Sequence, residues 1–192
     1  MTLERASAGW IEPSLSWSSI IGGALVAVAT SVFLGLLAAG FGLDLSVSGV
    51  ASHSSLAAFT PVAGAIAVAI QVVASAFGGY VAGRLRHVWT QAHADEMHFR
   101  DTAHGLIAWA LATVIGVLLT VLVMVPYAES LAPALAAPPP PPSPANIERA
   151  GHLAAQSAFF GAFGMILAAF TAAVAARLGG LQAEHMHARH LA

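Results

Sequence analysis

The sequence predicts an all-α integral membrane protein, a four-helix bundle that forms one domain over residues 1–192. Two observations lead to this prediction. The chain is 58% hydrophobic and only 8% charged, whereas a soluble domain carries roughly 25% charged residues because its surface must face water. Four uncharged runs are also each long enough for a helix to cross a hydrocarbon core of about 30 Å. The helices are expected at about 17–43, 61–85, 102–126 and 150–178.

The first two predicted helices have recognisable starts. The first follows Trp17, a residue type that is enriched at the membrane–water interface. Its apolar run exceeds the roughly 7–15 residues of a signal-peptide core, so we expect it to be retained. The second helix starts at Thr60 and Pro61, because threonine is a preferred N-cap and proline fits the first helical position.

The third and fourth predicted helices begin in similar ways. Asp101 and Thr102 precede the third apolar run; we expect one of them to cap the helix, and the Asp101 carboxylate to interact favourably with its dipole. Ser143 and Pro144 repeat the cap-and-proline pattern before the fourth. Five consecutive prolines lie just upstream at 138–142, and such a run favours a stiff polyproline II spacer.

The placement of arginine predicts the orientation of the chain. All seven basic residues are arginines, and most flank the second connection or lie near the two termini. Because basic residues accumulate on the cytoplasmic side, we expect a multi-pass protein of the bacterial cytoplasmic (inner) membrane with both termini cytoplasmic. The connections are then a cytoplasmic loop at 86–101, an outer proline-rich loop at 127–149 and a cytoplasmic tail at 179–192. The predicted membrane anchors are Trp17, Arg84, Arg86 and Arg177.

An internal similarity predicts a duplicated helical hairpin. AFGGYVAGRLR at 76–86 and AFTAAVAARLG at 169–179 share Ala-Phe, Val-Ala and Arg-Leu at the same spacing, 93 residues apart. Each unit holds two helices, so the two hairpins would cross the membrane in the same sense, as a parallel repeat. Chance similarity in an alanine-rich chain is the alternative.

Small residues recur at every fourth position of each predicted helix. Such stripes let helix backbones approach closely in lipid, where exclusion from water no longer drives association. The facing helix belongs either to this chain or to a partner. The predicted packing positions are Gly23, Ala27, Ser31, Gly35, Gly79, Gly83, Gly116, Gly164 and Ala168.

Two amides, Gln71 and Gln156, fall within the predicted spans. A polar side chain in lipid usually faces another helix and forms a hydrogen bond there. We therefore interpret both as contacts between helices, with the lining of a solute pathway as the alternative.

Several motifs together indicate a family. The pair GGYVAGRLR at 78–86 and HGLIAWALAT at 104–113, with a Gly- and Ala-rich first helix and a closing AARLGG, resembles a family of small four-helix bacterial membrane proteins, some of which are labelled PhnA-like. The resemblance covers most of residues 14–181. It implies the same membrane fold but no activity, ligand or catalytic residue. The zinc-ribbon proteins that share the label need cysteines, and this chain has none.

Two predicted cytoplasmic segments are rich in histidine and carboxylates. If they meet, they offer imidazole and carboxylate ligands for a divalent metal, or groups that titrate near neutral pH. Solvated polar segments are the alternative that we favour, because no spacing matches a defined metal motif. The candidate ligands are His93, His98, Asp101, His104, Glu184 and His187.

The function predicted from these features is that of a non-catalytic membrane protein without a cofactor. The sequence shows no nucleophile–base pair and no phosphate-cradling loop, and the predicted spans carry no ionisable residue at their centres, which argues against ion-coupled transport. We expect a structural or accessory subunit whose partners are the lipid bilayer and other membrane subunits or a second copy, with no nucleic acid. The alternatives are a passive pore or small-solute carrier, and a metal- or pH-responsive regulator that uses the cytoplasmic histidines.

Overall fold

The computed structural model describes residues 15–41, 61–86, 94–135 and 143–191, and these ranges contain four α-helices and no strand. This confirms the all-helical, four-helix prediction. The predicted end of the first helix at 42–43, the proline run at 138–142 and His93 lie outside the described residues. The helices are α1 (Trp17–Gly40), α2 (Pro61–Arg84), α3 (Ala94–Leu135) and α4 (Pro144–Leu191).

The bounds of α3 and α4 differ from the sequence-based expectation. Helix α3 already begins at Ala94, inside the expected cytoplasmic loop, and α4 continues through the expected tail to Leu191. The expected bounds were those of the apolar runs. A helix can, however, continue into a polar segment, where neighbouring side chains one turn apart stabilise it. Arg100 and Glu96 form such an i,i+4 ion pair on the polar first turns of α3.

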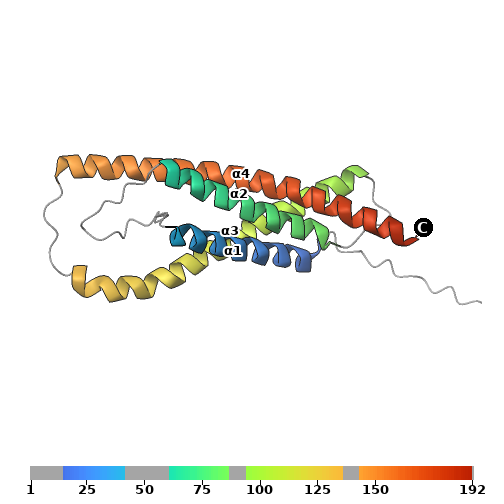
Figure 1. The fold of residues 1–192 in the computed structure, drawn as a ribbon, viewed down its shortest axis with the longest axis horizontal. Helices are drawn as coiled ribbons and strands as arrows, with labels where there is room; N and C mark the ends of the chain where they lie inside the picture. Colours follow the sequence, from blue (N-terminus) through green and yellow to red (C-terminus); the bar gives the residue numbers. More distant parts are fainter. Residues whose placement is uncertain (1–14, 42–60, 87–93, 136–142, 192) are drawn as a thin grey trace, which may run out of the picture.

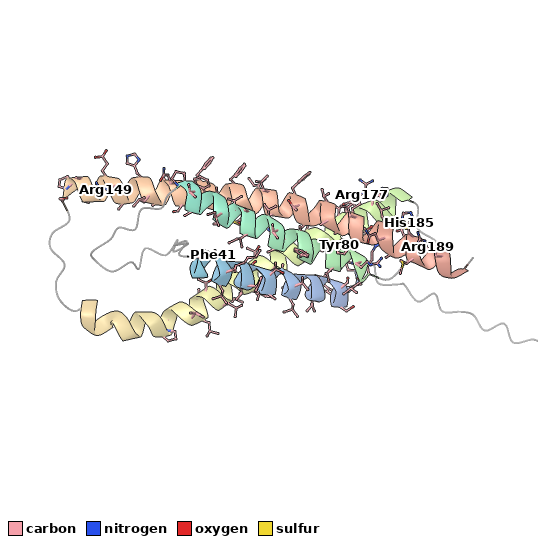
Figure 2. The ribbon with its side chains drawn as sticks, in the orientation of Figure 1. Phe41, Tyr80, Arg149, Arg177, His185 and Arg189 are labelled. Atoms are coloured by element: carbon pink, nitrogen blue, oxygen red, sulfur yellow. The ribbon has the colours of Figure 1, made fainter. Side chains whose placement is uncertain are left out.

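The helices alternate in direction, so α2 and α4 run parallel to each other (Figure 1). Helix α4 packs most extensively against α2, and α1 packs against α2 and α3. Helix α3 passes along the others and then diverges from them toward its C-terminal half (Figure 1). The end of the bundle where α2 and α4 terminate is called the arginine end. Figure 2 shows Arg177 and Arg189 there and Arg149 at the opposite end.

The interior of the bundle is built from small residues and its surface from large apolar ones. Among the described residues, every buried hydrophobic side chain except Ile20 is an alanine. Large side chains such as Leu36, Phe41 and Phe159 are exposed. Soluble proteins rarely expose so much contiguous apolar surface, whereas helices in lipid pack through small residues and face the acyl chains with large ones.

All four helices are long and apolar enough to cross a membrane, which is compatible with a multi-pass membrane protein. The candidate spans are Trp17–Gly40, Pro61–Arg84, Glu96–Val123 and Ile147–Met186.

Candidate functional site

The contact between α2 and α4 brings two backbones together without intervening side chains. A Cβ atom added at Gly79 would lie 2.7 Å from the Cα of Ala172, and one added at Gly83 would lie 2.8 Å from the Cα of Ala176. Neither position has room for a side chain. Gly105 of α3 approaches the same two alanines, so α2, α3 and α4 come into close contact with one another here.

A second close contact joins α1 to α2 through a pair of glycines. A Cβ atom added at Gly23 would lie 2.5 Å from the carbonyl oxygen of Gly78, and one at Gly78 would lie 2.6 Å from that of Gly23. Ala27, four residues further along α1, also contacts Gly78. Small residues that recur at helical spacing therefore form both helix contacts.

Three charged side chains meet inside the arginine end, in what we call the charge cluster: Arg86, Asp101 and Glu184. The Arg86 side chain is fully buried; its Nε pairs with Asp101 Oδ1, and its Nη2 donates to Asp101 Oδ2 at 3.1 Å and to Glu184 Oε1 at 2.6 Å. Asp101 is 2% exposed and Glu184 is 29% exposed. The charge cluster thus joins the end of α2 to α3 and α4. Two carboxylates around one guanidinium leave it with a net negative formal charge.

Two consecutive glycines of α4 make room for the charge cluster. A Cβ atom added at Gly180 would lie 2.7 Å from the Asp101 Cγ, and one at Gly179 would lie 2.9 Å from the Arg84 backbone nitrogen. Any side chain at Gly180 would displace the Asp101 carboxylate. The closing Gly-Gly of the AARLGG motif therefore lets α4 pass both the end of α2 and the Asp101 side chain.

His104 links α3 to the start of α1. The Ser16 backbone N–H donates to His104 Nε2 at 3.0 Å, and His104 Nδ1 lies 2.7 Å from the Arg100 carbonyl oxygen. Because Nε2 accepts, the proton is placed on Nδ1, which donates to that carbonyl, as in a neutral imidazole. The Ser16 and Ser19 hydroxyls contact each other beside the ring. All four helices therefore take part in buried polar contacts at the arginine end.

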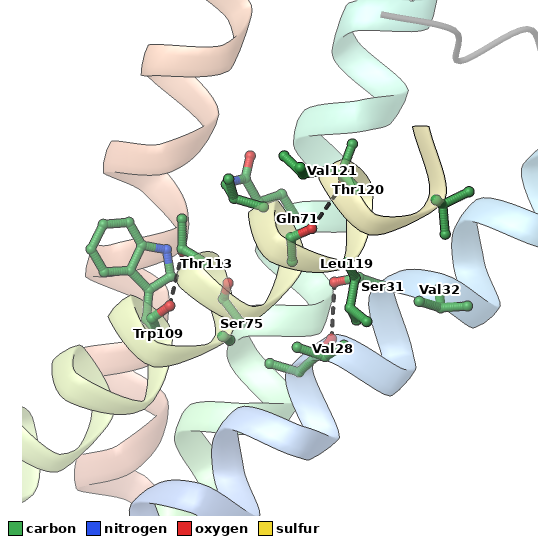
Figure 3. A pocket seen from close by; sticks show the side chains of 15 residues that line it. Val28, Ser31, Val32, Gln71, Ser75, Trp109, Thr113, Leu119, Thr120 and Val121 are labelled. Atoms are coloured by element: carbon green, nitrogen blue, oxygen red, sulfur yellow. Dashed lines mark hydrogen bonds between the residues drawn. The ribbon is translucent and has the colours of Figure 1, made fainter. Parts of the chain in front are cut away.

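A cavity of about 680 Å³ lies between α1, α2 and α3, where α3 begins to diverge (Figure 3). Its wall is mostly apolar and contains Gln71, Ser75, Trp109 and the hydroxyls of Ser31, Thr113 and Thr120. Each of these three hydroxyls donates to a carbonyl of its own helix, at 2.8–2.9 Å.

The predicted packing positions fall into three groups. The first lies buried or in contact between helices, the second lines the cavity, and the third has no neighbour from the described part of the chain within 4 Å of an added Cβ. The first group is Gly23, Ala27, Gly79, Gly83, Gly164 and Ala168. The second is Ser31 and Gly116, and the third is Gly35. Gly116 also has no such neighbour.

The predicted anchors and amides also have different surroundings. Trp17 and Arg177 are exposed and Arg84 is half-buried, whereas Arg86 lies inside the bundle rather than at its surface. Asp101 of α3 and Glu184 of α4 pair with Arg86. The interpretation of Arg86 as a membrane anchor did not include these partners.

The two amides, Gln71 and Gln156, also differ in how far they are buried. Gln71 lies half-buried against Gly164 of α4, since a Cβ added there would be 2.7 Å from its Oε1. Gln156 is exposed on α4.

The structure separates the candidate metal ligands. Asp101 and Glu184 meet around Arg86, His104 bonds to Ser16, and His98 Nδ1 lies 3.4 Å from Arg177 Nη2. The side chain of His187 lies outside the described part of the chain, as does all of His93. Among the side chains that the structure describes, no three His, Asp or Glu are grouped so as to hold a metal ion.

Sequence reasoning missed the partners of Arg86 and the role of Ser16. Asp101 lies 15 residues after Arg86 and Glu184 lies 98 residues after it, and the register of the packed helices brings the three together. The Gly-Gly pairs at 78–79 and 179–180 were the available signal, because both mark close approaches between helices. No family model, curated protein or solved structure matches the chain.

Proposed function

We propose that the protein is a non-catalytic integral membrane protein of the bacterial inner membrane that acts as a structural or accessory subunit. Its arginine end is held together by glycine contacts and by the charge cluster. Its opposite half presents small-residue positions to a partner, which is another membrane subunit or a second copy of the chain.

The observation that carries this proposal is the contrast between two sets of glycines. Near the arginine end, Gly23, Gly79 and Gly83 are each covered by the backbone of a neighbouring helix. Gly35 of α1 and Gly161 of α4 also lie within the candidate spans, but among the described residues no other helix comes within 4 Å of a Cβ added there. A glycine inside a helix costs up to about 1 kcal/mol relative to alanine, and close packing against a second helix offsets this cost. We infer that a partner helix supplies that packing.

Cross-linking tests the partner surface directly, because the chain contains no cysteine. Gly161→Cys is expected to cross-link in native membranes, either to itself or to a second protein identified by mass spectrometry. Phe170→Cys, on an exposed position of the same helix, is the matched control and should stay largely monomeric because it faces lipid. Equal cross-linking at both positions, or none at Gly161→Cys, would contradict the proposal.

We also propose that the termini are cytoplasmic, on the basis of the arginines gathered at one end (Figure 2). Glu148→Cys, next to the start of α4, is expected to react with a membrane-impermeant maleimide from the outer side of spheroplasts. Arg189→Cys, near the C-terminal end of α4, should react only after lysis. Both positions are exposed, so lysed samples must label equally. The reverse pattern would invert the proposed orientation.

The register of α2 against α4 supports a duplicated hairpin. Gln71 faces Gly164, Gly79 faces Ala172 and Gly83 faces Ala176, and each pair is separated by the 93 residues of the sequence repeat. Equivalent residues of two parallel repeats meet in this way when an approximate two-fold axis passes between them. We propose that α2 and α4 meet at such an axis, along the membrane normal.

A further inference from the structure

We propose that Arg177 of α4 and His98 of α3 together bind the headgroup of one anionic phospholipid at the arginine end of the bundle. The proposal rests on the membrane location of the chain but does not depend on its accessory role. Neither residue lines the cavity between α1, α2 and α3.

The two side chains approach each other from neighbouring helices and leave most of their donors available. Arg177 Nη2 lies 3.4 Å from His98 Nδ1, and Figure 2 shows Arg177 at the arginine end. A guanidinium has five N–H donors and an imidazole has at least one. Among the described residues, these donors make no hydrogen bond beyond that single contact. A ligand that offers several acceptor oxygens could therefore contact both side chains.

No carboxylate in the described part of the chain pairs with Arg177. The three carboxylates described at the arginine end, Glu96, Asp101 and Glu184, all pair with other arginines. Arg177 is exposed, so its positive charge faces whatever surrounds the helix. The planar fork of a guanidinium matches the oxygens of a phosphate group. The ligand is therefore an anion that carries a phosphate.

The depth of Arg177 along the bundle fits a phospholipid headgroup. Its neighbour Ala176 contacts Gly83, and α2 ends one residue later at Arg84. Arg177 thus lies level with the end of α2, where the apolar run stops and the interfacial region of a bilayer begins. A long arginine side chain at this level reaches the headgroups.

An apolar surface extends from Arg177 toward the middle of α4. Phe170 and Val174 precede Arg177 by seven and three residues, which places all three side chains on one face of the helix. Phe170 is 69% exposed and Val174 is 44% exposed. An acyl chain can lie along them while its headgroup contacts Arg177. Inorganic phosphate and soluble phosphate esters lack this second contact, so the ligand is assigned as a phospholipid.

A net negative charge distinguishes this ligand from the zwitterionic phospholipids. The amine of a zwitterionic headgroup would bring its own cation close to Arg177, and like charges repel at such distances. An anionic headgroup brings no cation. One basic side chain at the membrane surface favours anionic lipid roughly fivefold, and we expect a preference of this size.

Native mass spectrometry of the full chain tests the preference. The protein is delipidated in detergent and given equimolar phosphatidylglycerol and phosphatidylcholine with the same acyl chains. Adducts with one phosphatidylglycerol should outnumber those with phosphatidylcholine, and equal adducts would overturn the assignment of an anionic headgroup. Inorganic phosphate in large excess should leave the phosphatidylglycerol adducts in place. Displacement of the lipid by phosphate would overturn its assignment as a phospholipid.

Two variants locate the site in titrations with phosphatidylglycerol. Arg177→Gln should weaken binding roughly fivefold, because it removes the positive charge. His98→Ala should weaken it roughly threefold, as expected for the loss of one hydrogen bond. Neither residue belongs to the charge cluster, and a monodisperse protein–detergent complex is verified first, so misfolding is seen separately from loss of binding. Unchanged binding in either variant would overturn the two-residue site.

The matched control is Arg189→Gln, near the same end of α4. Arg189 is also exposed, but the residue seven positions before it is Gln182 rather than a phenylalanine. Arg149→Gln, at the opposite end (Figure 2), is the second control, and both should bind phosphatidylglycerol as the unmodified chain does. An equal loss in Arg189→Gln and Arg177→Gln would indicate general charge attraction and overturn the site. The Gly161→Cys cross-link reports the accessory role independently.

Discussion

Gly83→Leu is expected to prevent α2 from packing against α4 and to give the largest loss of stability of any single glycine substitution on α2. A Cβ at this position would lie 2.8 Å from the Cα of Ala176 and would also overlap its carbonyl. The obstacle is backbone rather than a flexible side chain, so the helices must separate. Overpacking typically costs 1–3 kcal/mol and occasionally more, and we expect a loss of roughly 3 kcal/mol or more. The midpoint of unfolding in an SDS titration of detergent-solubilised protein measures it.

Gly151→Leu provides the control for Gly83→Leu. It makes the same change within a helix, at a position where no described residue outside its own helix turn lies within 4 Å of an added Cβ. Its unfolding midpoint should match or slightly exceed that of the unmodified chain, because leucine has the better helix propensity. If Gly83→Leu unfolds at the same SDS fraction as Gly151→Leu, the described contact between α2 and α4 is incorrect.

The second large effect is expected in the charge cluster. Arg86→Met leaves Asp101 buried without its cation, and breaking a buried ion pair from one side costs about 3–5 kcal/mol. Asp101→Leu should cost less, because Arg86 still pairs with the partly exposed Glu184. The double variant Arg86→Met/Asp101→Leu should recover part of the loss, because it removes both charges of the buried pair. SDS titration of the four proteins gives the coupling energy.

Arg177→Met is the matched control for the charge cluster. Arg177 lies at the same end of the bundle, but it is exposed, and exposed charges contribute little to stability. Its unfolding midpoint should stay close to that of the unmodified chain. Additive losses in the double variant would show that Arg86 and Asp101 do not stabilise each other, contrary to the geometry described here.

The sequence was sufficient to predict the four helices, because uncharged runs of this length have few alternatives to membrane-spanning helices. It was not sufficient for their ends. Helices α3 and α4 continue into polar segments, and the length of an apolar run carries no information about such extensions.

The site was predictable to a smaller extent. Gly79 and Gly83 were found because a small-residue stripe is a local pattern, visible within one helix. The partners of Arg86 come from two other helices and depend on their register. An arginine at the end of an apolar run looks the same in sequence whether it reaches the headgroups or turns inward toward a carboxylate.

The order of the charge cluster along the chain has a consequence for biosynthesis. Arg86 is synthesised first, Asp101 follows in the next helix, and Glu184 arrives only with the last turns of α4. Chains emerge from the ribosome with the N-terminal part first, so Arg86 can be neutralised by Asp101 while α4 is still being made. The third charge joins an arrangement that already exists. Termination of translation just before Gly180 would therefore yield a chain in which Arg86 pairs with Asp101 and Ala172 and Ala176 still pack against α2, but which lacks Glu184, the third charge of the cluster.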